Sequence, residues 1–359
     1  MRVSVADSIE QLQALENDWE ELYGDAVNAN IFLSFDWIFT WLKHYSFNVS
    51  HVRIFCVWDD SQLVAVLPLY KKTSRFSIEY WFIGTGEPEA CEVCSEYQDI
   101  LCKTGLEARV VNVFSELFKN ERNILGLRLP NVRENALLKA LLGKLPARFM
   151  IEQRACGQRF FIPTKNGIAA TKLTQKSRRY LNVFNRLPQA MVTEPQSETE
   201  VIESFDTLTA LHNARWQKRL ATTIFENAHF NRFHRDLIIK LFRQERLSMM
   251  IIKVEERDIA AIYCMQSGND MVYYQSGHDD SFRPNISAGN LSHFFQASKA
   301  ANKHFDSYDL LASKSADSYK SKLVECQEPI YSISFYRSRF LRFLANFTLR
   351  IERLTSHTS

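Results

Sequence analysis

The chain has 359 residues, of which 46% are hydrophobic and 24% are charged, a composition typical of globular proteins. This length predicts about two domains. The formal net charge of +3 is too small to indicate a nucleic-acid-binding protein, and no apolar run approaches the roughly 20 residues that span a bilayer. The first residues, Met1 to Asp7, lack an apolar core, so we expect no signal peptide.

The seven cysteines are an odd number, which suits a reduced, cytoplasmic compartment. Cys91 and Cys94 have the spacing of half a zinc site, and Cys102 follows them. No second pair or neighbouring histidine completes such a site. Free loop thiols are therefore the favoured interpretation, and we expect no metal.

The first part of the chain alternates helical and strand patterns. Apolar spacing predicts helices over residues 8–23, capped by Ser8, and over 35–45. A hairpin follows, with strands at 53–58 and 63–67 joined by an Asp-Asp-Ser turn. Further elements are predicted as strands over 78–83, 97–101 and 124–129 and a helix over 106–119.

The hairpin pattern recurs about 196 residues later, which indicates an internal duplication. Residues 248–262 repeat the first hairpin, and residues 271–277 repeat 78–84. Both copies continue with a loop, a helix and a strand, and in the second copy this helix runs from 286 to 303 with Ser287 as its N-cap. The last strand is predicted over 305–311.

The duplication predicts an α/β (α+β) fold of two tandem domains with mixed, mainly antiparallel sheets flanked by helices. We place the boundary near 163–171, so that the domains are residues 1–165 and 166–330.

Two further features of the second copy are candidates for substrate binding. Basic residues crowd into one short stretch: Lys172, Lys176, Arg178, Arg179 and Arg186. They form either a solvated helix face or a clamp for an anionic substrate or cofactor. A helix predicted over 200–219 has an apolar stripe that is expected to be core, whereas Arg215 and Trp216 lie at its end. The predicted substrate-binding residues are Arg178, Arg215, Trp216 and Tyr274.

A set of short motifs, taken in chain order, resembles a known family. The motifs are Ser34-Phe35-Asp36-Trp37 with Trp41, Ala65-Val66-Leu67-Pro68-Leu69, Phe82-Ile83-Gly84, Tyr97-Gln98-Asp99-Ile100-Leu101, Lys176-Ser177-Arg178-Arg179, Leu211-His212 with Arg215-Trp216, Ser287-Ala288-Gly289 and Tyr319-Lys320. The chain resembles the CelD-type acyltransferases of the GNAT superfamily, which have two tandem GNAT-like domains and are similar to the Fem-type peptidyltransferases. The family usually has Ser-Pro-Gly where this chain has Ser287-Ala288-Gly289.

The resemblance implies transfer of an acyl group, most simply acetyl, from acyl-CoA to an amine or hydroxyl of a small molecule or saccharide precursor. Exopolysaccharide or envelope biosynthesis is the implied setting. A backbone N–H of a splayed strand would stabilise the carbonyl oxygen. Asp309, Tyr319 and Lys320 follow or end the last strand and are the predicted catalytic residues. His278 and Asp279 are second choices.

The two copies differ where a cofactor would bind. The helix of the first copy has Glu107 in its first turn, and this carboxylate would repel a pyrophosphate. The second copy opens with Ser287, Ala288, Gly289 and Asn290, which carry no acid and allow a phosphate to approach backbone N–H groups. These four are therefore the predicted acyl-CoA-binding residues, and the first copy is predicted to be degenerate.

Two alternatives remain open. The first is a Fem-like transferase that uses aminoacyl-tRNA, in which the basic cluster of residues 172–186 would contact the tRNA. The second is a catalytically inactive scaffold for polysaccharide assembly, because the chain has Asp309-Leu310-Leu311-Ala312-Ser313 where the family often has a glycine after the aspartate.

The C-terminal stretch from Phe335 to Leu354 predicts one amphipathic helix. Five arginines and one acid give residues 335–359 a local charge of +4. The apolar stripe contains Phe340, Phe343, Leu344, Phe347, Ile351 and Leu354, and the flanking polar row contains Arg339, Arg342, Asn346, Arg350 and Arg353. The helix either docks on the protein by its aromatic side or lies in the plane of an anionic membrane, as a peripheral contact at the inner face.

Overall fold

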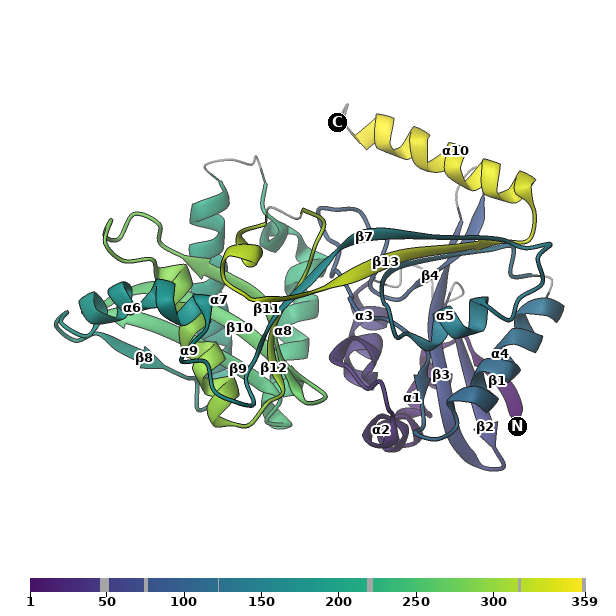
Figure 1. Cartoon of the computed structure of the whole chain (residues 1–359), viewed down its shortest axis with the longest axis horizontal. Helices are drawn as coiled ribbons and strands as arrows, with labels where there is room; N and C mark the ends of the chain where they lie inside the picture. The colour runs from purple at the N-terminus through teal and green to yellow at the C-terminus, as the bar shows by residue number, and fades with distance from the viewer. Residues whose placement is uncertain (46–51, 74–76, 122, 218–221, 316–317, 357–359) are drawn as a thin grey trace. The chain divides into compact units, whose positions relative to one another are not determined.

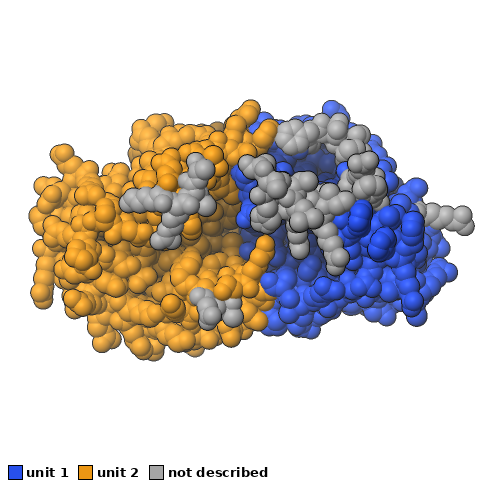
Figure 2. All heavy atoms as spheres, turned by 90° about the horizontal axis from the view of Figure 1, so that it is seen from above, with its two compact units in different colours: residues 1–156, 329–359 blue, residues 157–328 orange. Residues whose placement is uncertain are grey.

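The structure is a computed structural model that describes residues 1–45, 52–73, 77–121, 123–217, 222–315 and 318–356. The chain divides into two compact units (Figure 2). Unit 1 comprises residues Met1–Cys156 and Pro329–Ser359, and unit 2 comprises Gly157–Glu328. The predicted α/β class, with mixed, mainly antiparallel strands flanked by helices, is confirmed (Figure 1).

Unit 1 has its strands in the order β1-β2-β3-β4-β6-β13, in which only β4 and β6 pair in parallel. Its elements are β1 (Arg2–Ala6), α1 (Ile9–Gln13), α2 (Glu16–Asp25), α3 (Phe35–Tyr45), β2 (Val52–Asp59), β3 (Gln62–Thr73), β4 (Ile78–Phe82), β5 (Leu101–Cys102), α4 (Glu107–Asn120), β6 (Gly126–Arg133), α5 (Leu137–Leu142) and α10 (Arg339–Ser356). Strands β7 (Met150–Pro163) and β13 (Cys326–Tyr336) have residues in both units.

Unit 2 has the strand order β7-β12-β11-β10-β9-β8, in which only β11 and β12 are parallel. Its elements are α6 (Lys172–Phe184), β8 (Met191–Thr193), α7 (Glu198–Trp216), α8 (Ala228–Arg243), β9 (Leu247–Val254), β10 (Arg257–Ser267), β11 (Asp270–His278), α9 (Ala288–Asn302), β12 (Ser307–Ser313) and the 3₁₀ turn η4 (Tyr319–Lys322). The last two residues of the helix predicted over 200–219 lie outside the described residues.

The order of elements that led to the predicted duplication recurs in the structure, because β2-β3-β4-α4-β6 in unit 1 has the same sequence of pairings as β9-β10-β11-α9-β12 in unit 2. The two hairpin turns also share a backbone conformation. Asp60 and Glu255, each the first residue after the leading strand, have φ angles of 53° and 57°. A positive φ in a two-residue connection matches the twist of the flanking strands.

Three predicted elements differ from the structure. The helix over 8–23 is two helices, because the Leu15 amide donates to the Leu12 carbonyl and tightens the turn, although Ser8 caps α1 as predicted. The strand over 97–101 is reduced to β5, since the Asp99 carboxylate instead accepts the amides of Leu137 and Leu138. The C-terminal helix begins at Arg339, because Phe335 and Tyr336 pair with β6 as the end of β13.

The helices of unit 2 cover both faces of its strands. Helix α7 packs so closely on β11 that a Cβ at Gly277 would lie 2.4 Å from the Leu208 carbonyl oxygen and 2.6 Å from the His212 amide nitrogen. On the other face, Tyr273 of β11 contacts His293 of α9. Strand β11 is thus held between two helices, and its C-terminal end at His278 leads directly into the loop before α9.

Candidate functional site

The parallel ladder between β11 and β12 is short. It contains the pairs Asp270–Ser307, Met271–Tyr308 and Val272–Asp309 and is not continued, although β11 runs on to His278 and β12 to Ser313. Beyond Val272 the facing backbone groups of the two strands therefore do not pair with each other. Their amides and carbonyls can accept a ligand between the two parallel strands.

Both strands are irregular where this ladder ends. The pairing of β10 with β11 shifts register between Tyr263 and Cys264, whose partners are Gln275 and Tyr273, so that Tyr274 is the extra residue of a bulge in β11. In β12, the pairing with β7 shifts between Asp309 and Ala312. Leu311 there has a φ of 63°, a left-handed conformation that is rare for leucine. Such bulges re-aim side chains and are frequent beside active sites.

A cluster of polar aromatic residues surrounds the end of the ladder. The His293 Nδ1 and the Tyr308 hydroxyl are 2.8 Å apart, and the Tyr273 hydroxyl lies 3.1 Å from the Ser276 Oγ. Tyr319 of η4, 51% exposed, hydrogen-bonds to Tyr273 through its hydroxyl. Burial lowers the pKa of His293 to about 3, so its imidazole is neutral at physiological pH.

The first turn of α9 has the features that were predicted for anion binding. Ser287 caps the helix, and its Oγ accepts the Asn290 amide. No acid lies in this turn. Gly289 faces His278, because a Cβ at this position would lie 3.0–3.2 Å from atoms of the imidazole ring. The four predicted cofactor-binding residues therefore lie together, next to the C-terminal end of β11.

The basic helix α6 packs beside this turn. Its Ser177 Oγ donates to the Asn290 carbonyl at 3.5 Å, and its apolar face joins a core with Ala288 and Leu291 of α9. Arg178, a predicted substrate-binding residue, is exposed next to Ser177. The packing brings positive charge near the start of α9, as a clamp for an anion requires.

The end of α7 is tied to the loop after β11. The Arg215 Nε donates to the Asp280 Oδ2 at 3.0 Å, and the His278 Nε2 lies 3.1 Å from the Asp280 Oδ1. The Arg215 guanidinium lies 5.4 Å from the centre of the Trp216 ring. Burial, with the nearby Arg215 charge, lowers the pKa of His278. Arg215 and Trp216 thus border the same loop as the predicted cofactor residues.

Asp309 lies in a buried ion cluster at the last pair of the ladder. Its Oδ2 accepts the Arg159 Nε at 2.6 Å, and its Oδ1 accepts the Leu311 amide at 2.7 Å. Arg159, which is 4% exposed, also contacts Asp270 at 3.3 Å and Glu328 at 3.2 Å. The carboxylate of Asp309 is thereby engaged in holding β12 to β7 and in fixing the bulge.

Lys320 lies beside the polar cluster, whereas Tyr274 lies on the other face of β11. The Lys320 Nζ donates to the Ala312 carbonyl at 2.8 Å, which fixes η4 to the end of β12 beside Tyr319. Tyr274 is buried on the opposite face of β11, where its ring lies 4.8 Å from that of His234 and 5.5 Å from that of Tyr263. Tyr274 is therefore separated from Tyr319 by the strand itself.

His234 makes unit 2 sensitive to acid. Burial among aromatic rings lowers its pKa to about 3, whereas an unfolded histidine titrates near 6.5. The unfolded chain then binds more protons between these values, so folding stability falls as pH decreases through this window. We expect the loss of unfolding free energy between pH 7 and pH 5 to be about 2 kcal/mol smaller in His234→Phe than in the wild type. Hydrogen exchange of α8 peptides at both pH values measures the unfolding free energy of unit 2. Equal losses of this free energy in the wild type and in His234→Phe would contradict the assignment of the acid sensitivity to His234.

The matching helix of unit 1 is different at its start. The first turn of α4 contains Glu107, whose Oε1 accepts the Gly105 amide at 3.0 Å. This carboxylate occupies the position at which an anionic ligand would meet the helix. The geometry favours unit 2 as the place for an anion.

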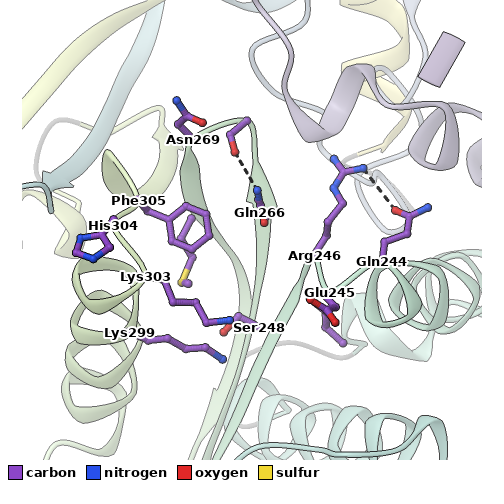
Figure 3. A pocket seen from close by; sticks show the side chains of 13 residues that line it. Gln244, Glu245, Arg246, Ser248, Gln266, Asn269, Lys299, Lys303, His304 and Phe305 are labelled. Carbon is purple, nitrogen blue, oxygen red and sulfur yellow. Dashed lines mark hydrogen bonds between the residues drawn. The ribbon is translucent and has the colours of Figure 1, made fainter. Parts of the chain in front are cut away.

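A separate cavity of about 440 Å³ lies at the opposite end of α9 (Figure 3). Lys299, Lys303 and Phe305 line it, and the Lys299 Nζ is paired with the Glu194 Oε2 at 2.5 Å. None of the predicted site residues contributes to it. A helix C-terminus carries a partial negative charge, which disfavours a phosphate there. Within the described residues, no group of three or more His, Cys, Asp and Glu side chains is arranged to hold a metal ion.

The sequence interpretation missed several residues of the site: Arg159, Tyr273, Ser276, His293 and Tyr308. An arginine beside the apolar run Phe160-Phe161-Ile162 is a signal that could have indicated a buried charge, since lone buried charges need partners. His293 lies on the buried face of α9 near another polar residue, Gln296, and carried no comparable signal.

Residues 172–321 match the family model described as an acetyltransferase (GNAT) domain. This range contains β11, α9, β12 and Tyr319, and therefore the polar aromatic residues at the end of the ladder, whereas Arg159 lies before it. None of the curated proteins matches the sequence.

Solved structures resemble the fold over nearly the whole chain. FemX aligns with a TM-score of 0.59 and 10% identity, covering 93% of this chain and 97% of its own. The C-terminal domain of a protein named as a lysylphosphatidylglycerol synthetase from Agrobacterium fabrum aligns at 0.58 and 8% identity, covering 95% and 96%. A conserved protein of unknown function from Bacteroides thetaiotaomicron aligns at 0.57 and 14% identity, covering 93% and 100%. At these identities the likeness concerns the fold alone.

Proposed function

We propose that the protein is a GNAT-type acyltransferase that moves an acyl group from acyl-CoA to an amine or hydroxyl of a small molecule or saccharide precursor. The observation that carries the proposal is the short parallel ladder of β11 and β12, which ends at a polar cluster beside the acid-free start of α9. The match of residues 172–321 to a GNAT domain supports it. We also propose that the protein is a CelD-type acyltransferase and that it acts in envelope polysaccharide synthesis.

The residues at the start of α9 fit the anionic part of such a donor. Ser287 to Asn290 present backbone N–H groups and small side chains without an acid, and α6 adds positive charge beside them. Acyl-CoA, when bound, would supply the acyl group as an activated thioester. The corresponding turn of unit 1 carries Glu107 and fits less well.

The reaction needs stabilisation of a developing oxyanion and of a leaving thiolate. Backbone N–H groups of β11 beyond Val272 are not taken up by β12, so they can face an acyl carbonyl oxygen. The Tyr319 hydroxyl keeps its proton at neutral pH, because a tyrosine titrates near 10, and it can donate a hydrogen bond to the sulfur. Lys320 holds η4 in place through the Ala312 carbonyl.

Tyr319→Phe should lower turnover by roughly 10²-fold while the dissociation constant of acyl-CoA changes little, because the hydroxyl acts on the leaving group and not on the bound donor. Lys320→Ala should lower turnover in the same way, since η4 loses its tie to β12. Thiol release from acetyl-CoA with a panel of amines and hydroxyl compounds measures both. Tyr331→Phe in unit 1 is the matched control, and unchanged turnover in both variants would remove these residues from the mechanism.

Donor binding is tested with Gly289→Asp and Glu107→Gln, measured by native mass spectrometry with a panel of acyl-CoAs. The new carboxylate would lie at the helix N-terminus against the pyrophosphate, so we expect the affinity to fall at least about tenfold. Glu107→Gln should leave it unchanged. A higher affinity in Glu107→Gln, together with an unchanged affinity in Gly289→Asp, would mean that the donor binds in unit 1.

A Fem-like transferase that uses aminoacyl-tRNA is the second candidate, favoured by the whole-chain fold likeness to FemX. The basic face of α6 would then contact the tRNA. Titration with acetyl-CoA and with aminoacyl-tRNA separates the two, and binding of neither would favour an inactive scaffold.

A further inference from the structure

Helix α10 turns aromatic side chains toward solvent. Phe340 is 67% exposed, Phe343 is 63% exposed and Phe347 is 44% exposed, and the rings of Phe343 and Phe347 are stacked at 6.2 Å. Their spacing of three and four residues places them along one side of the helix. Large apolar side chains that are exposed side by side indicate an interaction surface.

The opposite side of the helix is the one that packs on unit 1. Ala345 is 1% exposed, and the Asn346 Oδ1 lies 3.5 Å from an Arg128 side-chain nitrogen. The Arg342 guanidinium is paired with Glu152 of β7. The helix is thus anchored by its polar and small residues, and its phenylalanines are left outside. The sequence-based expectation that the aromatic side docks on the protein is wrong for these three phenylalanines.

Positive charge runs along the border of the aromatic face. Arg339 is exposed directly before Phe340. Arg350 and Arg353 belong to the same helix by sequence. Four arginines against the single acid Glu352 give residues 339–356 a charge of +3. No helix among the described residues has the length and apolarity needed to cross a bilayer.

We propose that this aromatic and basic face of α10 binds the surface of a bilayer rich in anionic phospholipid. The phenylalanines would enter the boundary between headgroups and acyl chains while the arginines contact lipid phosphates. A second copy of the chain fits less well. The helix carries a net charge of +3, so two copies of α10 in contact would repel each other, and interface cores are depleted of charge. The inference does not depend on acyl transfer.

The experiment is co-sedimentation of the full chain with vesicles of phosphatidylcholine alone or mixed with phosphatidylglycerol. We expect binding only to the mixed vesicles and weaker binding at high salt. Arg339→Gln/Arg350→Gln should weaken it by roughly 30-fold. Phe340→Ser/Phe343→Ser should abolish it without unfolding, because both side chains are already exposed.

The matched control is Arg186→Gln/Arg232→Gln, which removes the same charge from exposed positions in unit 2 and should leave binding intact. Equal loss in this control, or vesicle binding that survives both α10 double variants, would overturn the proposal. A second outcome would also overturn the proposal: the wild type forms a dimer in analytical ultracentrifugation and does not bind vesicles, and the dimer dissociates in Phe340→Ser/Phe343→Ser. Helix α10 would then be a protein interface.

Discussion

Arg159→Leu is expected to lower the unfolding free energy of unit 2 by about 3–5 kcal/mol, the cost of breaking a buried ion pair from one side. The variant would leave the buried carboxylate of Asp309 without its 2.6 Å contact to the guanidinium. It would also remove the contacts to Asp270 and Glu328. Peptide-level hydrogen exchange of β12 and β11 measures the opening free energy of this unit separately from unit 1.

The control for this prediction lies on the same strand. Arg154 of β7 is paired with Glu152, but its side chain is 74% exposed, so Arg154→Leu should change stability by no more than about 1 kcal/mol. Asp309→Asn should destabilise unit 2 in the same direction as Arg159→Leu. An Asp309→Asn protein that keeps full stability and loses turnover would instead make Asp309 a catalytic residue.

Gly277→Ala is expected to destabilise unit 2 by about 3 kcal/mol, at the upper end of overpacking effects. The new Cβ would lie 2.4 Å from the Leu208 carbonyl oxygen and 2.6 Å from the His212 amide nitrogen. These are backbone atoms of α7, so relief requires the helix to move off β11. Hydrogen exchange of α7 and β11 peptides detects the loss.

Gly24→Ala is the matched comparison. Gly24 lies in α2, and a Cβ there would meet nothing within 4 Å. The substitution should stabilise unit 1 by up to about 1 kcal/mol, because alanine loses less backbone entropy in a helix. Similar effects of both substitutions would mean that the close approach of α7 to β11 is not required.

The hairpins could be predicted from sequence because their determinants are local. Strands β2 and β3 are runs of mainly apolar residues that flank a turn with Asp60. Strands β9 and β10 flank Glu255 in the same way. The cap of α9 was equally accessible, because a serine is a favoured N-cap residue and Ser287 directly precedes the helix. The hairpin turns and the helix cap depend on residues that are close to each other in the sequence.

The chemistry of the site depends on contacts that sequence spacing does not encode. Arg159 and Asp309 are 150 residues apart and meet only because β7 and β12 are neighbours. Tyr273 and His293 meet because α9 crosses back over β11. Tyr273 contacts His293 whereas Tyr274 contacts His234, and no local pattern predicts the bulge at Tyr274.

The central claim is that acyl-CoA binds in unit 2, between β11, β12 and the start of α9. Hydrogen–deuterium exchange with and without saturating acetyl-CoA tests it most directly, because protection is read along the backbone. We predict protection confined to peptides covering residues 273–278, 287–291 and 310–313. Protection at residues 83–107 of unit 1, or no protection by any acyl-CoA together with clear protection by aminoacyl-tRNA, would contradict the account.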